Sequence, residues 1–221
     1  MKSWRDITNR KWKMIMRTSG LILFASLLAG CSHAPQPGDP EFSTVGFLKD
    51  HDATKLSDIV LIPESAEAIN GKSLPFNSKS MWVYVTRYAP TGNDCPDGQF
   101  DSDCAHFQSH ALAAAGIKIN KPSAACTKGM SIRVKDLALA FDNASRRYHN
   151  IMKFTDYHQA KRGDFCFLPR IPGGINDHMM LLDATPDPQG AFVWSHTNNR
   201  IGTHAPFDPA RCVFYRIQDK P

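Results

Sequence analysis

A cysteine at the junction of a polar turn and an apolar helix is the first candidate for chemistry in this sequence. Three residues that can each cap a helix N-terminus precede Cys104, and apolar residues then follow at helical spacing as far as Gly116. The predicted helix therefore carries Cys104 in its first turn. Unpaired backbone N–H groups and the positive end of the helix dipole favour a thiolate there, which is the nucleophilic form of cysteine.

Such a nucleophile needs a base within hydrogen-bond reach, and two histidines in the C-terminal half are candidates. His178 begins one apolar run and His196 ends the next. A symmetric antiparallel hairpin centred near Asp187 would set position 178 opposite 196, so that both side chains share a face. We therefore predict that His178 is the base and that His196 orients it. Asn198, one pleat beyond His196, is the alternative third member.

The remaining elements must hold these side chains together. A second amphipathic helix is predicted over 132–144, whereas 81–86 fits a strand or a helix equally well. Short strand-like runs follow, separated by Pro and Gly turns, at 164–168, 178–183, 190–196 and 213–217, and an earlier one lies at 58–62. Helices first and strands afterwards favour an α+β domain, in which the helices pack on an antiparallel sheet.

Four ordered blocks resemble a bacterial amidase domain related to the NlpC-type and other papain-like cysteine hydrolases. These blocks are 103–109 (DCAHFQS), 162–167 (RGDFCF), 177–178 (DH) and 195–198 (SHTN). The resemblance covers roughly Tyr84 to Pro206 and implies a papain-like fold with the nucleophile at a helix start. It also implies acyl transfer to Cys104, an oxyanion hole from the Cys104 backbone N–H and Gln99, and no cofactor. Asp164 is expected to be a turn and strand-entry residue rather than an acid or base.

The N-terminus is typical of an exported lipoprotein. The apolar run 21–30 follows a basic segment and, as a helix, would extend about 15 Å, roughly half the hydrocarbon thickness of a bilayer. Residues 28–31 (LAGC) resemble the lipobox of bacterial lipoproteins, which implies cleavage before Cys31 and its lipidation. Ser32 after it implies delivery to the outer membrane, facing the periplasm. Ordinary secretion with cleavage nearby is the alternative.

Composition divides the chain into a leader at 1–30, a Pro-, Gly- and Ser-rich tether at 31–44, and one folded domain at 45–221. Six of the 26 Lys and Arg residues and one of the 21 Asp and Glu residues lie in the leader, so the remainder carries 20 of each sign. The mature chain is formally neutral. Its charge gives no support to nucleic-acid binding.

The cysteines suit an oxidising compartment. With Cys31 assigned to lipid and Cys104 to catalysis, an even set remains that could form two disulfides of unspecified pairing. That set is Cys95, Cys126, Cys166 and Cys212. The alternative is a structural disulfide between Cys104 and Cys95. No metal is expected, although His106 and His110 lie four residues apart on the predicted helix, where we expect them to be solvated or supporting residues.

A lipid-anchored hydrolase in the envelope would have cell-wall peptide within reach, so amide bonds of peptidoglycan are the favoured substrate. The membrane would be reached through Cys31. A binding or assembly lipoprotein with a disused papain-like site is the alternative, and an acyltransferase or a hydrolase of another amide is a weaker one. The sequence indicates no oligomeric state.

Overall fold

The computed structural model describes residues 53–65, 72–90, 103–169, 176–196 and 200–219. Three α-helices and eight β-strands lie in these ranges. The leader, the tether with Cys31, and the predicted residues Cys95, Gln99 and Asn198 lie outside the described residues. The helices are α2 (Ser78–Tyr88), α3 (Cys104–Ala114) and α4 (Val134–Arg147).

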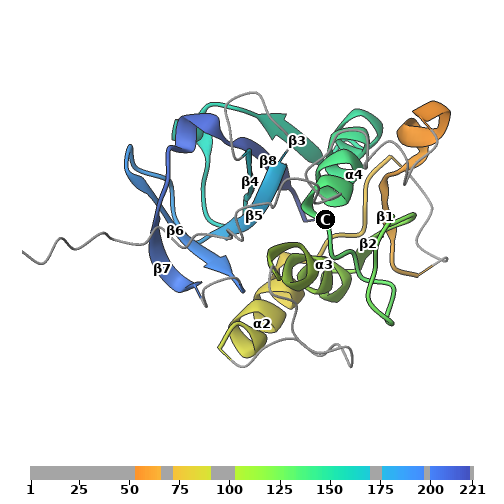
Figure 1. Ribbon diagram of the computed structural model, residues 1–221, viewed down its shortest axis with the longest axis horizontal. Coiled ribbons are helices and arrows are strands. Elements are labelled where there is room, and N and C mark those ends of the chain that lie inside the picture. The colour runs from red at the N-terminus through yellow and green to blue at the C-terminus, as the bar shows by residue number, and fades with distance from the viewer. Residues whose placement is uncertain (1–52, 66–71, 91–102, 170–175, 197–199, 220–221) are drawn as a thin grey trace, which may run out of the picture.

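Two antiparallel sheets accompany the helices (Figure 1). The smaller one pairs β1 (Leu61–Pro63) with β2 (Ile117–Ile119). The larger one has the order β3-β8-β4-β5-β6-β7. Its strands are β3 (Ile151–Phe154), β4 (Phe165–Pro169), β5 (Asn176–Leu182), β6 (Gly190–Ser195), β7 (Arg200–Pro206) and β8 (Val213–Ile217).

Most of the predicted elements are present. The helix that begins at Cys104, the second amphipathic helix and all four C-terminal strands are confirmed, with boundaries that differ from the predicted ones by at most three residues. The ambiguous run 81–86 is helical, because Asn77 caps α2 through Ser80 N at 3.0 Å and Met81, Tyr84 and Val85 form its buried stripe. Strands β2, β3 and β7 were not predicted.

The six-stranded sheet has two differently covered faces. Side chains alternate along each strand, so Phe165 and Phe167 of β4 point toward the helices, while Cys166 points the other way. The helices lie together on the first of these faces, and β1 and β2 lie beyond them (Figure 1). The main core is therefore formed where the helices pack on this face of the sheet. Helix α3 is the most buried of the three helices.

A buried ion pair fixes the turn that leads into β4. Gly163 takes a positive φ of 90°, which residues with a side chain rarely adopt, and Asp164 after it is 1% exposed. Arg216 of β8 donates to both carboxylate oxygens of Asp164, from Nε at 2.8 Å and from Nη2 at 2.7 Å. The backbone N–H of Lys161 donates to the same carboxylate at 2.8 Å. The prediction that Asp164 is a turn residue is confirmed.

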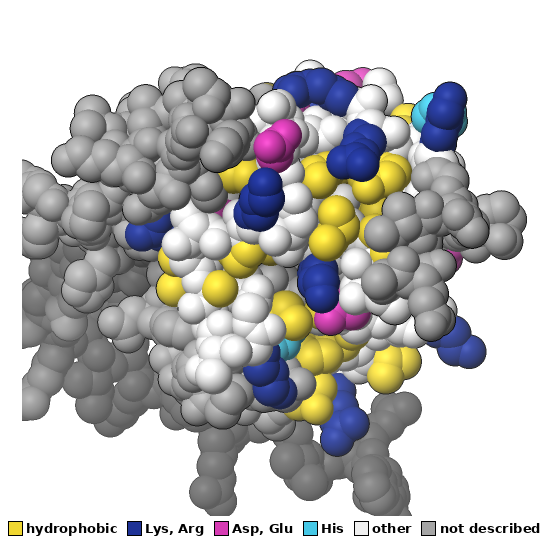
Figure 2. All heavy atoms as spheres, turned by 90° about the vertical axis from the view of Figure 1, so that its right-hand side faces the viewer, with side chains coloured by type: hydrophobic (Ala, Val, Ile, Leu, Met, Phe, Trp, Pro, Cys, Tyr) yellow, Lys and Arg dark blue, Asp and Glu magenta, His cyan; other side chains and the backbone are white. Residues whose placement is uncertain are grey.

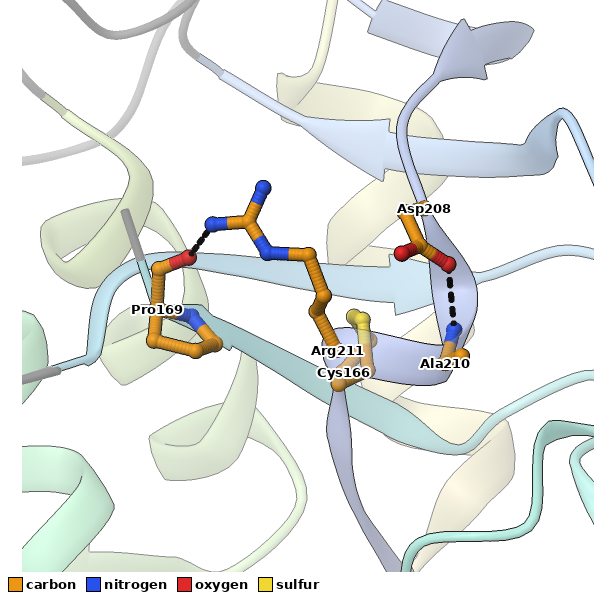
Figure 3. Close-up of a disulfide and its surroundings, with 6 residues drawn as sticks. Cys166, Pro169, Asp208, Ala210 and Arg211 are labelled. Atoms are coloured by element: carbon orange, nitrogen blue, oxygen red, sulfur yellow. Dashed lines mark hydrogen bonds between the residues drawn. A yellow bond between two sulfur atoms is a disulfide. The ribbon is translucent and has the colours of Figure 1, made fainter. Parts of the chain in front are cut away.

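Within the described residues, a disulfide joins β4 to the residue before β8. Cys166 of β4 is bonded to Cys212, which directly precedes β8 (Figure 3). Beside it, Arg211 donates to the backbone oxygen of Pro169. The structure thus supplies one pair from the predicted set. Cys126 lies beside His106 and His110, and the other member of the predicted set, Cys95, lies outside the described residues.

The surface is mixed in character on the face shown in Figure 2. There, Lys and Arg side chains lie apart from one another among hydrophobic and uncharged ones. Within the described ranges, no helix has both the length and the apolar character that a membrane span requires.

Candidate functional site

Helix α3 positions the site because it is buried along most of its length. Residues 104–112 are all buried, including the polar side chains of His106, Gln108, Ser109 and His110. The helix ends where Gly116 takes a φ of 92° and packs so closely that a Cβ would lie 2.9 Å from the backbone oxygen of Pro75. Buried polar groups on a central helix require partners, and these partners define the site.

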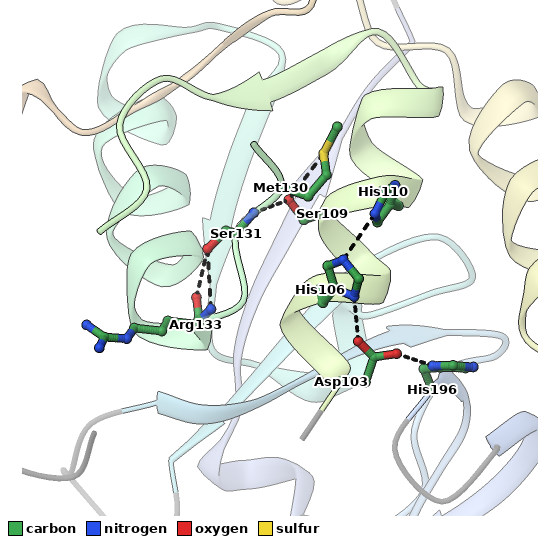
Figure 4. A network of polar contacts seen from close by, with 8 residues as sticks. All are labelled: Asp103, His106, Ser109, His110, Met130, Ser131, Arg133 and His196. Carbon is green, nitrogen blue, oxygen red and sulfur yellow. Dashed lines mark hydrogen bonds and ion pairs between the residues drawn. The ribbon is translucent and has the colours of Figure 1, made fainter. Parts of the chain in front are cut away.

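Asp103 is the centre of the polar network (Figure 4). It is 3% exposed, and its carboxylate accepts hydrogen bonds from Nδ1 of His106 at 2.7 Å and from Nδ1 of His196. Its side chain makes no capping bond to the α3 backbone. Burial opposes ionisation, but the hydrogen bonds from His106 and His196 outweigh it and lower the pKa of Asp103 below its usual range. Asp103 therefore serves two imidazoles rather than the helix end.

His106 connects this carboxylate to a second histidine. Its Nε2 lies 3.2 Å from Nε2 of His110, one helical turn further along α3. Burial disfavours the charged ring, yet hydrogen bonds with Asp103 and Cys126 outweigh that effect and raise the pKa of His106. His106 and His110 are expected to be solvated or supporting residues, and the structure excludes the solvated alternative because both are buried within this network.

His196 is held firmly against the start of α3. Its ring stacks on Phe107, with ring centres 5.3 Å apart and planes 20° from parallel. Nearby, Nε2 of Gln108 donates to the backbone oxygen of Trp194 at 2.9 Å, which fastens α3 to β6. With Nδ1–H directed at Asp103, the neutral ring leaves Nε2 as a proton acceptor. The strand and the helix together thus present an oriented imidazole beside the N-terminus of α3.

His178 does not share a face with His196, contrary to the predicted hairpin register. Strands β5 and β6 pair Leu181 with Trp194 and Leu182 with Val193, a register in which position 179, and not 178, would correspond to 196. This slip of one residue moves a side chain to the other face of a sheet. His178 pairs with Leu168 and lies on the face of Met180, which is opposite to the face on which α3 packs.

Cys104 is the first residue of α3, as predicted, and is completely buried. The alternative disulfide partner, Cys95, lies outside the described residues. Of the predicted set Cys104, His178 and His196, the structure brings His196 to Asp103, the direct neighbour of Cys104 in sequence, and places His178 elsewhere.

Sequence reasoning missed two features of this site. Asp103 was treated as a cap, although an Asp three residues before His106 can meet it across one helical turn. Cys126 was treated as half of a disulfide. No spacing rule connects Cys126 to His106 and His110, because the loop that carries it folds back over α3.

The comparisons with known proteins give no match. No protein-family model, no curated protein and no solved structure matches this chain. The resemblance to the amidase domain therefore stays a prediction that rests on four short blocks.

Proposed function

We propose that the chain is a cysteine-dependent hydrolase of amide bonds with a papain-like α+β fold. The observation that carries this proposal is the hydrogen bond from Nδ1 of His196 to the carboxylate of Asp103, next to Cys104 at a helix start. A cysteine, an imidazole and a group that orients the imidazole are the parts that such catalysis needs. In this proposal His196 is the base, and Asp103 takes the orienting role that the sequence analysis gave to His196.

The reaction would proceed in two acyl transfers. His196 removes the thiol proton of Cys104, and the thiolate sulfur bonds to the amide carbonyl carbon. The C–N bond then breaks as His196 returns the proton to the leaving amine. Water attacks the resulting thioester and gives a proton to His196; as the C–S bond breaks, His196 passes this proton to the sulfur, which releases the acid and restores the thiol. The backbone N–H of Cys104 lies in the first turn of α3, next to the sulfur, and is the donor that we assign to the oxyanion.

The substrate proposed is the peptide or amide part of peptidoglycan. This choice rests on the predicted lipid anchor at Cys31, which would hold the domain in the envelope, facing the periplasm. The anchored domain would then meet the wall at a high local concentration. A chain without a lipid anchor would lose this support for the substrate, but the proposed chemistry would be unaffected.

The test is incubation of the purified full-length chain with peptidoglycan, followed by mass analysis of the released fragments. We expect Cys104→Ala and His196→Ala each to abolish release while leaving the fold intact by circular dichroism. His178→Ala is the matched control, because His178 lies on the other face of the sheet, and it should retain activity. Loss of activity in His178→Ala with retention in His196→Ala would reverse the assignment of the base.

Complete burial of Cys104 favours one alternative, an envelope-binding lipoprotein in which the papain-like site is disused. Labelling with a thiol-directed electrophile separates the two proposals. A working nucleophile reacts in the folded chain and loses its reactivity in His196→Ala. A disused site reacts only after the chain unfolds.

A further inference from the structure

Three side chains that commonly ligate metals converge beside the proposed hydrolase site. His106 and His110 come from consecutive turns of α3, and Cys126 comes from the loop between β2 and α4. One ligand atom from each residue lies within 4.8 Å of the other two, and all three residues are buried. The proposed hydrolysis uses none of these three side chains, so this group goes beyond the proposed function.

The separation of the two imidazoles matches a tetrahedral metal site. Zn–N bonds of 2.0–2.1 Å at the tetrahedral angle place two nitrogens about 3.3 Å apart. The two Nε2 atoms of His106 and His110 lie 3.2 Å apart. A histidine pair alone can also share a hydrogen bond at this distance. The thiol of Cys126 adds a soft third ligand, and imidazole with thiolate is the donor set that suits zinc.

Neighbouring groups orient the ligands. The carboxylate of Asp103 accepts from Nδ1 of His106, so the lone pair of a neutral ring lies on Nε2, toward His110 (Figure 4). A carboxylate behind a histidine is the usual outer partner of a metal-bound imidazole. The ring of Tyr84 stacks on His110 with planes 6° from parallel and centres 5.9 Å apart. Both imidazoles are therefore set in place without a metal.

The loop that carries Cys126 is fixed to the same helix. The backbone N–H of Cys126 donates to the oxygen of Met130 at 2.9 Å, and that of Gly129 donates back to Cys126 at 2.7 Å. Ser131 N donates to Oγ of Ser109 on α3 at 3.0 Å (Figure 4). The tight turn and its bond to α3 hold the sulfur over the two histidines.

We propose that His106, His110 and Cys126 bind one Zn²⁺ ion, with a fourth position open to water or another ligand. Charge supports this assignment. A Cys126 thiolate and the buried Asp103 carboxylate together carry two negative charges, which balance a divalent cation in a buried position. Metal binding releases the thiol proton of Cys126 to solvent.

The proposal is tested by metal content and by cobalt substitution on the purified full-length chain without a histidine tag. Equilibrium dialysis against Zn²⁺ should give one ion per chain. Co²⁺ in its place should show a thiolate-to-cobalt charge-transfer absorption and the d–d bands of a tetrahedral site. Cys126→Ser should lose the charge-transfer absorption, and His110→Gln should weaken binding by about 100-fold or more.

Two matched controls should bind as the wild type does. Cys104→Ser removes a buried thiol at the start of α3 that is not a proposed ligand, and His204→Gln removes an exposed histidine that pairs with Asp187. Absorption lost in Cys104→Ser and kept in Cys126→Ser would overturn the proposal. So would a chain that binds no zinc, or recovery of Cys126 in a disulfide.

A second measurement needs no variant and keeps the test independent of folding. Zn²⁺ should slow alkylation of Cys126 in the wild-type chain, as read by peptide mass analysis, and a chelator should restore it. Alkylation that is indifferent to Zn²⁺ would overturn the proposal. Because neither readout involves hydrolysis, an inactive chain that binds zinc refutes only the proposed function, and an active chain that binds none refutes only the metal site.

Discussion

Two aspartates, Asp164 and Asp103, are buried almost equally in this protein but have chemically different hydrogen-bond partners. Asp164 is 1% exposed and Asp103 is 3% exposed. Asp164 is closed by the guanidinium of Arg216 and a backbone N–H, and neither of these changes its charge near neutral pH. Asp103 is bonded to two imidazoles, which can gain protons, lose protons or ligate a metal. The partners of a buried carboxylate, rather than its burial, distinguish a structural position from a chemical one.

The strongest test of the structural side of this comparison is Arg216→Met. It would leave the Asp164 carboxylate buried without its cation, and we expect the free energy of unfolding to fall by about 3 to 5 kcal/mol. Urea denaturation with the disulfide intact measures it. Adding Asp164→Asn to the same chain should recover part of the loss, because the unpaired charge is then gone. A fall below about 1 kcal/mol would contradict a tightly coupled pair.

The corresponding test on the chemical side is Asp103→Asn. An amide of the same shape cannot accept from both imidazoles as a carboxylate does, so His196 loses its orientation. We expect kcat/KM for amide hydrolysis to fall by about 100-fold or more, which is about 2.7 kcal/mol. Asp164→Asn is the cross-control, and it should lower stability without lowering the activity of the folded fraction. Unchanged hydrolysis in Asp103→Asn would place Asp103 in the same structural class as Asp164.

Tyr215 is a third buried ionisable group, and burial is the main influence on its pKa. Burial raises the pKa of Tyr215 to about 12, although the positive charge of Arg146 acts in the opposite direction. The folded chain therefore holds the phenol proton more tightly than the unfolded chain. This contribution to stability is complete below about pH 10 and is lost as the pH rises through about 12, in total roughly 3 kcal/mol. Denaturation of the wild type and Tyr215→Phe between pH 9 and 12 should show the slope in the wild type alone.

We expect the smallest effect on stability at an ion pair that is exposed to solvent. Glu64 and Lys118 form an ion pair at 3.5 Å, with side chains 43% and 39% exposed. Lys118→Gln should change the free energy of unfolding by less than about 0.5 kcal/mol. A change in the free energy of unfolding as large as that of Arg216→Met would show that burial does not determine how much these ion pairs stabilise the fold.

The elements of the fold were easier to predict than their pairing. The cap and the apolar spacing identified α3, and alternating short runs identified four strands. The register of β5 and β6 differs by one residue from the symmetric hairpin, because Leu181 pairs with Trp194 and the pairing is therefore centred between positions 187 and 188 rather than on Asp187. Turn geometry of this kind decides the face on which His178 lies and is invisible in a hydrophobic pattern.

The site was predicted only in part for a related reason. Cys104 and His196 could be selected because their residue types carry chemistry wherever they occur. The role of Asp103 depends on a contact across 93 positions of sequence, and that of Cys126 on a loop folding back onto α3. Local rules describe neighbours within a helical turn, and neither of these long-range contacts is of that kind.

The disulfide constrains only one of the two chain segments that form the candidate site. Cys166 and Cys212 are 46 positions apart, and the covalent ring that they close contains β5, β6 and β7. The entropy that this ring removes from the unfolded chain is worth about 4 kcal/mol. His196 lies inside the ring, whereas Asp103 lies outside it. Reduction would therefore free the strand that carries the imidazole in the unfolded chain, while the helix that carries the carboxylate would gain no new freedom. The hydrogen bond between Asp103 and His196 therefore joins a segment that the disulfide encloses to a segment outside it. Reducing conditions would change the unfolded-state freedom of the first segment only.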